Sequence, residues 1–242
     1  MKRSFAGLTD TGLVRSVNQD AFYIDDPEGR FFIVADGMGG HVGGQEASRI
    51  ATETIEKYLV EGWKSSQKTA DLLKEAFLKA NQVIVDDQLD HPERSDMGTT
   101  AVAVVFRDRN QPWCAHVGDS RLYRLHGKEL TQITEDHTWV GRALKAGHLT
   151  VEEARKHPWR HVLAQCLGRQ DLQQIDLQEL EVQPGDRLLL CSDGLTEELS
   201  AEAIGPNLQL ELSGDESAQK LVNAAKDQGG RDNITVVIVT LE

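Results

Sequence analysis

The segment FFIVADGMGGHVGG, residues 31–44, joins an apolar strand pattern to a loop that has almost no side chains. The apolar run ends at the lone carboxylate of Asp36, and glycine occupies five of the next eight positions. An unbroken apolar run is typical of a strand with both faces buried. Asp-Gly is a common turn dipeptide, but glycines also let a charged group approach the backbone closely. The rest of the chain decides between a simple turn and a binding loop.

The composition is that of an ordinary globular protein, and the net charge excludes some classes of partner. The 242 residues are 39% hydrophobic and 27% charged, without a linker or repeat, so we expect a single domain over residues 1–242. The net charge of -13 argues against nucleic-acid and anionic-membrane partners. No apolar stretch resembles a signal peptide or a membrane span, so we expect a cytoplasmic monomer. The widely separated Cys114, Cys166 and Cys191 are predicted to be reduced and buried, and their spacing argues against a zinc site.

The order of strand and helix patterns predicts an α+β fold. Strand patterns cover residues 5–10, 20–25, 30–36, 99–106, 112–118, 120–125, 129–134, 175–182, 186–193 and 233–241. Helical spacing of apolar residues covers 47–59 and 73–84, and a further helix is expected within 215–228. Blocks of strands separated by helix pairs favour two packed antiparallel sheets, a β-sandwich with helices outside.

Acidic residues recur where predicted strands begin or end. They are Asp20, Asp36, Asp119, Asp193 and Asp232. One such residue alone is more often a turn or a cap, but strand ends can hold several side chains converging on one point. Converging carboxylates repel unless a cation neutralises them. A set of oxygen ligands suits Mg²⁺ or Mn²⁺, so the glycine loop after Asp36 fits both a turn and a metal site.

Six motifs carry a resemblance to a known family. They are RSVNQDAFY (15–23), VADGMGGHVGG (34–44), MGTTA (97–101), HVGDSRLYR (116–124), CSDGLTEEL (191–199) and GRDNITVVIV (230–239). Their order and spacing make the chain similar to the metal-dependent serine/threonine protein phosphatases, the PPM or type 2C family, in a minimal bacterial form. This resemblance implies a four-layer α-β-β-α sandwich with a mobile flap over roughly residues 138–175.

The resemblance also implies which residues hold metal ions. Asp36, Asp193 and Asp232 would hold one Mn²⁺ or Mg²⁺ ion. Asp36 would bridge to a second ion, which also takes the carbonyl of Gly37. Asp20 would act mainly through water.

A weaker third ion and the substrate contacts follow from the same resemblance. Asp119, together with Asp193, would bind the third ion. Arg15 would grip the phosphate of a phosphoserine or phosphothreonine protein substrate, and His41 would protonate the leaving oxygen. Hydrolysis would proceed by direct attack of a metal-bridging hydroxide.

Simpler roles remain open for several of these residues. Without the motif, Arg15 reads as a surface arginine, and His41 could bond a loop carbonyl. Arg169 could reach substrate from the flap side or form a structural ion pair.

Two other functions also remain open for the chain as a whole. One is a non-catalytic relative, although such a protein would be marked by lost acids and all five are present. The other is a two-metal phosphoesterase for nucleotides or small phosphate esters.

Overall fold

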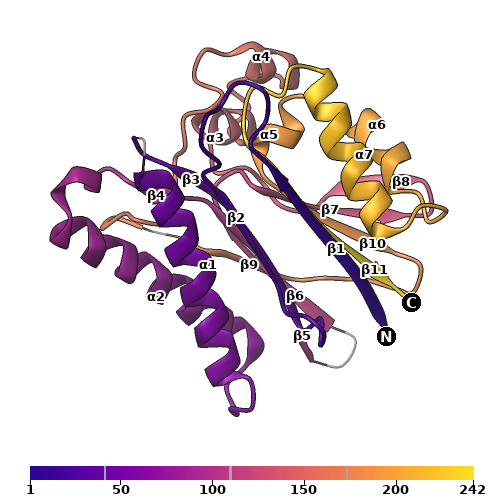
Figure 1. Cartoon of the computed structure of the whole chain (residues 1–242), viewed down its shortest axis with the longest axis horizontal. Coiled ribbons are helices and arrows are strands. Elements are labelled where there is room, and N and C mark those ends of the chain that lie inside the picture. The colour runs from indigo at the N-terminus through magenta and orange to yellow at the C-terminus, as the bar shows by residue number, and fades with distance from the viewer. Residues whose placement is uncertain (41, 109–110, 173) are drawn as a thin grey trace.

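Antiparallel strands form two sheets that pack face to face (Figure 1). The computed structural model describes residues 1–40, 42–108, 111–172 and 174–242. The first sheet has the order β1 (Arg3–Asp10), β11 (Ile234–Leu241), β10 (Arg187–Cys191), β7 (Arg121–His126) and β8 (Glu129–Gln132). The second has the order β2 (Asp20–Ile24), β3 (Phe31–Met38), β5 (Ala101–Asp108), β6 (Gln111–Val117) and β9 (Asp176–Glu179), with β4 (Gly98–Thr99) beside the end of β3.

Helices cover the outer faces of both sheets. Two long helices, α1 (Gly43–Gly62) and α2 (Thr69–Asp90), lie on the second sheet, and α7 (Gly214–Asp227) lies on the first. In Figure 1 the purple helices α1 and α2 lie on one side of the sandwich and the yellow α7 on the other. The shorter helices are η1 (Pro92–Arg94), α3 (Trp139–Lys145), α4 (Val151–Lys156), α5 (Asp193–Thr196), α6 (Ala201–Ile204) and η2 (Gly205–Leu208).

The apolar run of β3 is buried on both faces. Phe31, Ile33 and Ala35 face the core beneath α1 and α2. Phe32 and Val34 point the other way, into the core between the two sheets. Because side chains alternate along a strand, one unbroken apolar segment serves both cores. The predicted α+β sandwich with outer helices is therefore confirmed.

Several element ends differ from the sequence prediction, and three of them lie near the acids or in the second sheet. β3 continues past Asp36 to Met38, because Gly37 and Met38 pair with Thr99 and Gly98 of β4. β10 ends at Cys191, and Asp193 begins helix α5 rather than ending a strand. β9 is shorter than the predicted span 175–182. The extended end of β3 depends on pairing with β4, far away in the chain, which local patterns do not contain.

Three further observations bear on the sequence predictions. Cys114, Cys166 and Cys191 are all free and buried, which confirms the prediction for the thiols. Among the helices of the described residues, none combines the length and the apolarity needed to cross a membrane. The segment 138–175 contains α3 and α4, and its role as a flap stays a prediction.

Phe32 should be a main source of stability, because its side chain is fully buried between the sheets. Its ring lies 5.4 Å from that of Phe5 and 6.1 Å from that of Phe106. We expect Phe32→Ala to lower the free energy of unfolding by about 3–5 kcal/mol, measured by urea denaturation. The control Leu78→Ala, at an exposed position of α2, should change it by less than about 0.5 kcal/mol. Equal effects would contradict this account of the core.

Candidate metal centre

The five predicted acids come together at one end of the sandwich. Asp20 lies directly opposite Asp36 in the ladder between β2 and β3. The carboxyl of Asp193, at the start of α5, lies close enough to that of Asp36 for the two to repel each other. Asp119 follows β6 and Asp232 precedes β11, and both are close enough to repel Asp36 electrostatically. The second sheet thus supplies Asp20 and Asp36, and the first supplies the element ends that carry Asp193 and Asp232.

Crowding changes the acidity of these carboxyls. Burial, followed by repulsion from neighbouring carboxylates, raises the pKa of Asp20 to about 7 and that of Asp193 to about 6, both from 3.8. The same causes hold the pKa of Asp36 and of Asp119 well above the ordinary value. Among the described residues, none of these four carboxyls forms an ion pair with an arginine or lysine, whereas Asp232 pairs with Arg15. A divalent cation would compensate their charge by favouring the ionised forms.

One oxygen of Asp20 is held and the other is not. The Ser192 hydroxyl donates to Oδ2 of Asp20 at 2.7 Å, and the same hydroxyl accepts the Thr235 N–H at 3.0 Å. Oδ1 of Asp20 is buried and has no hydrogen-bond partner among the described residues. A buried carboxylate oxygen without a partner is unfavourable unless water or a cation contacts it. Its position inside the acid cluster therefore points to such a contact.

Close backbone packing explains the glycine at position 37. A Cβ there would lie 1.9 Å from the carbonyl oxygen of Gly44 and 2.6 Å from that of Gln19. The Gly37 N–H also donates to the Gln19 carbonyl at 3.1 Å. The start of α1 and the segment before β2 thus both pack on this peptide, which leaves no room for a side chain. Metal ligation by the Gly37 carbonyl stays a prediction.

Asn233 fastens the loop that carries Arg15. Its amide donates to the carbonyls of Thr11 and Val17 at 3.0 Å each, and its Oδ1 accepts the Gln19 N–H at 2.8 Å. Arg15, within this loop, places an Nη 2.7 Å from Oδ2 of Asp232, while about half of its side chain remains exposed. The guanidinium therefore reaches the acids and still faces solvent.

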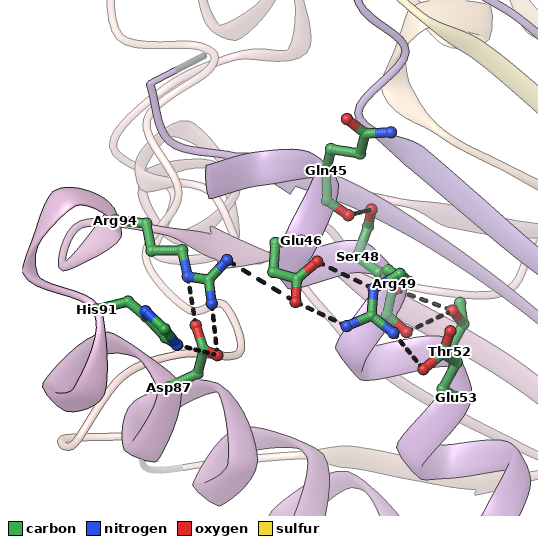
Figure 2. A network of polar contacts seen from close by, with 9 residues as sticks. All are labelled: Gln45, Glu46, Ser48, Arg49, Thr52, Glu53, Asp87, His91 and Arg94. Atoms are coloured by element: carbon green, nitrogen blue, oxygen red, sulfur yellow. Dashed lines mark hydrogen bonds and ion pairs between the residues drawn. The ribbon is translucent and has the colours of Figure 1, made fainter. Parts of the chain in front are cut away.

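A chain of ion pairs supports the start of α1 (Figure 2). Glu46, in the first turn of α1, pairs with Arg49 at 2.7 Å and with Arg94 at 3.9 Å. Arg94 pairs in turn with Asp87 near the end of α2 at 2.6 Å. Exposed pairs contribute little individually, but Arg94 and Asp87 are mostly buried. The network joins α1, α2 and the segment that leads into β4, and β4 pairs with Gly37 and Met38.

Two other predicted site residues have different outcomes. His41 lies outside the described residues, so its role stays a prediction. The guanidinium of Arg169 is held in a two-point contact by Asp171, at 2.8 and 2.9 Å. This is the structural ion pair that the sequence left as an alternative, and a contact between Arg169 and substrate stays untested.

Comparison with known proteins agrees with this geometry. Residues 14–233 match the family described as protein phosphatase 2C. The chain belongs to this family. The match includes the five acids and Arg15, and the family is one of metal-dependent hydrolases.

Named relatives of this phosphatase 2C chain are bacterial enzymes. It is 37% identical to the protein phosphatase PhpP of Streptococcus pneumoniae, over 97% of this chain and 96% of PhpP. It is also 37% identical to the serine/threonine protein phosphatase PstP of Mycobacterium tuberculosis, over 97% of this chain but only 44% of PstP. The chain thus spans less than half the length of PstP. A crystal structure of the PstP catalytic domain in complex with two manganese ions has a TM-score of 0.88 and 35% identity, covering 99% of this chain and 98% of that one.

Two residues near the acids were not assigned from the sequence. His161 pairs with Glu197, and one ligand atom from each of His161, Asp193 and Glu197 lies within 4.8 Å of the other two. His161 therefore brings the segment 138–175 against the metal centre. A signal for Glu197 was available, because it follows Asp193 by four residues, one helical turn. No local pattern indicates His161, since its contact depends on the path of a long segment.

Metal-free protein should lose stability as the pH rises, because the pKa values of Asp20 and Asp193 are higher in the folded chain than in the unfolded chain. The folded chain holds protons on Asp20 and Asp193 up to about pH 6–7, whereas the unfolded chain releases them near pH 4. Between these values the folded state binds more protons, so the free energy of unfolding falls with rising pH by about 1.4 kcal/mol per pH unit for each extra proton.

Substitution of Asp20 tests this directly. Asp20→Asn cannot ionise, so its loss of stability from about pH 5 to about pH 8 should be smaller than that of the wild type. Urea denaturation in EDTA measures the difference. The control Asp90→Asn, at the exposed end of α2, should keep the wild-type slope. Identical slopes for Asp20→Asn and the wild type would contradict the raised pKa.

Proposed function

We propose that this chain is a metal-dependent protein phosphatase that hydrolyses phosphoserine and phosphothreonine in proteins. The observation that carries the proposal is the convergence of five carboxylates from both sheets, with Asp20 opposite Asp36 in the ladder between β2 and β3 and Asp193 close enough to Asp36 to repel it. Family membership and the named relatives support the same activity. A non-catalytic relative has no need of uncompensated acids, because they lower stability when no cation is bound.

The oxygen ligands suit two core ions of Mn²⁺ or Mg²⁺. We assign Asp36, Asp193 and Asp232 to one ion, and Asp36 with the Gly37 carbonyl to the second. The PstP catalytic domain crystallised with two manganese ions supports this number. Bound ions would neutralise charge at the phosphate and supply a nucleophile at neutral pH.

Two further metal contacts belong to the same proposal. Asp20 would contact the core ions through water, with its carboxylate oriented by Ser192. Asp119, which lies close enough to Asp193 to be repelled by it, would hold a weaker third ion with that residue.

In the same proposal, Arg15 binds the substrate phosphate. The guanidinium of Arg15 offers a planar pair of donors that matches two phosphate oxygens. Its exposed half leaves it accessible to a phosphorylated side chain on another protein. By the same proposal, His41 donates a proton to the departing serine or threonine oxygen.

Release of phosphate from peptides tests the function. Purified protein should dephosphorylate phosphoserine and phosphothreonine peptides in Mn²⁺, lose this activity in EDTA and regain it when Mn²⁺ is restored, because oxygen ligands bind these ions reversibly. Asp193→Asn should lower turnover at least ~100-fold, since it removes a ligand of the core ions. The control Asp90→Asn should leave turnover unchanged. Activity on nucleotides alone would indicate a phosphoesterase, and full activity after chelation would rule out the metal.

His41 is tested by comparing two leaving groups. A serine alkoxide is strongly basic and needs a proton to depart, whereas p-nitrophenolate leaves without one. We expect His41→Ala to reduce kcat on phosphoserine peptides about 10²–10⁴-fold, and on p-nitrophenyl phosphate much less. The alkaline limb of the pH–rate profile should also disappear. Equal losses on both substrates would mean that His41 organises the site rather than donating a proton.

A further inference from the structure

His137 lies against the turn that carries Asp119. Its backbone N–H donates to the Gly118 carbonyl at 2.9 Å, and its ring nitrogen Nδ1 accepts the Gly118 N–H at 3.2 Å. One residue therefore holds both hydrogen-bonding groups of Gly118. Only glycine fits at position 118, because φ there is +104° and a Cβ would lie 2.5 Å from a carbon of Thr100.

The far side of the ring is held as well. Because Nδ1 accepts a hydrogen bond, the proton of a neutral His137 ring lies on Nε2. Nε2 is 3.2 Å from Oδ2 of Asp176, the first residue of β9, and donates to it. Asp176 thereby fixes the tautomer and the ring orientation that the Gly118 contact needs.

The same residue begins the segment that leads to His161. The His137 carbonyl accepts the Ala164 N–H at 2.7 Å, and Thr138 pairs with Leu163 across this segment. His137 thus joins the Asp119 turn, the start of β9 and the base of the segment 138–175.

The hydrogen-bond geometry does not suit a metal ion at this place. One ligand atom from each of His116, His137 and Asp176 lies within 4.8 Å of the other two. However, the two imidazole rings are stacked, with centroids 4.6 Å apart and planes 26° apart. Lone pairs lie in the ring planes, so those of stacked rings run side by side rather than converging on one ion. Nε2 of His137, moreover, carries the proton donated to Asp176.

We propose that His137 is a positioning residue that fixes the Gly118–Asp119 turn, so that the Asp119 carboxylate stays in place for the weaker third ion. The proposal rests on the proposed function. Asp193 and Asp136 repel the Asp119 carboxylate and Arg121 attracts it, so its position depends on how firmly its turn is held. The two hydrogen bonds to Gly118 hold this turn, and the hydrogen bond to Asp176 maintains them.

Two substitutions separate the contacts of the ring. His137→Asn places an amide oxygen near the position of Nδ1 and loses the donor to Asp176. His137→Gln places an amide near the position of Nε2 and loses the acceptor for Gly118. We expect His137→Gln to weaken the weakest Mn²⁺ ion about 10–100-fold, as loss of a group that orients a ligand does, and His137→Asn to weaken it much less.

Two measurements give the result without relying on turnover. Calorimetric titration with Mn²⁺ reports the affinity of each ion. Amide hydrogen exchange by NMR in metal-free protein should show faster exchange at Gly118 in His137→Gln than in His137→Asn. The matched control is His126→Gln, because His126 also pairs with an aspartate, Asp186 at 2.7 Å, at the far end of β7. This control should leave both readouts unchanged.

A double substitution tests whether His137 acts through Asp119. In an Asp119→Ala background, His137→Gln should have no further effect on Mn²⁺ binding. Equal weakening of all ions, or an undiminished effect in that background, would overturn the proposal. So would an ion that Asp119→Ala retains and His137→Gln loses. If His137→Gln fails to fold, His137→Asn alone tests the proposal. Loss of protection of the Gly118 amide from hydrogen exchange in His137→Asn would then contradict the proposal. A wild type that binds three ions but hydrolyses no phosphopeptide would refute the proposed function and leave this inference standing.

Discussion

Repulsion between carboxylates that are partly withdrawn from water is the constraint on which the rest of the structure depends. Burial, followed by the charge of four other aspartates, raises the pKa of Asp36 well above its ordinary value. Flexible side chains would relieve this repulsion by turning outward into solvent. These carboxylates cannot do so freely, because they stand on a strand, on a helix start and on loops fixed by hydrogen bonds. A strained, charged centre of this kind persists only where its surroundings determine its geometry.

The surroundings are the apolar layers and the close backbone contacts. Phe32 and Val34 fix β3 against the opposite sheet, while Phe31 and Ile33 fix it against the helices. Asp36 therefore follows five residues whose side chains are completely buried. Stability comes from these layers, and the centre itself detracts from stability until cations bind. Because the apolar residues of β3 supply stability and Asp36 at their end supplies a ligand, one short segment serves both the core and the metal centre.

Local patterns predict the parts of this fold that repeat at short range. The two-sided apolar run of β3, the spacing along α1 and α2 and the five acids can be read from the chain. The extension of β3 cannot, because it depends on pairing with β4, far away in the chain. The short helix α5 was missed because the apolar strand pattern before it continues up to Asp193. His137 was missed for the same reason as the extension of β3: its bonds to Gly118 span 19 residues and leave no periodic signal. The ion pair of Arg169, by contrast, could be read from the sequence, because its partner Asp171 lies only two residues away.

The origin of the acids in two different sheets has a consequence for folding. Asp20 and Asp36 lie on the second sheet, whereas Asp193 and Asp232 flank strands of the first. When no cation is bound, repulsion acts between the sheets at this end and opposes the apolar core that holds them together. A cation shared by Asp36 and Asp193 would reverse the sign of that interaction. Because such an ion binds the folded chain and not the unfolded one, occupancy of the centre and packing of the sandwich are linked equilibria. The site is therefore a second connection between the sheets as well as a place for chemistry.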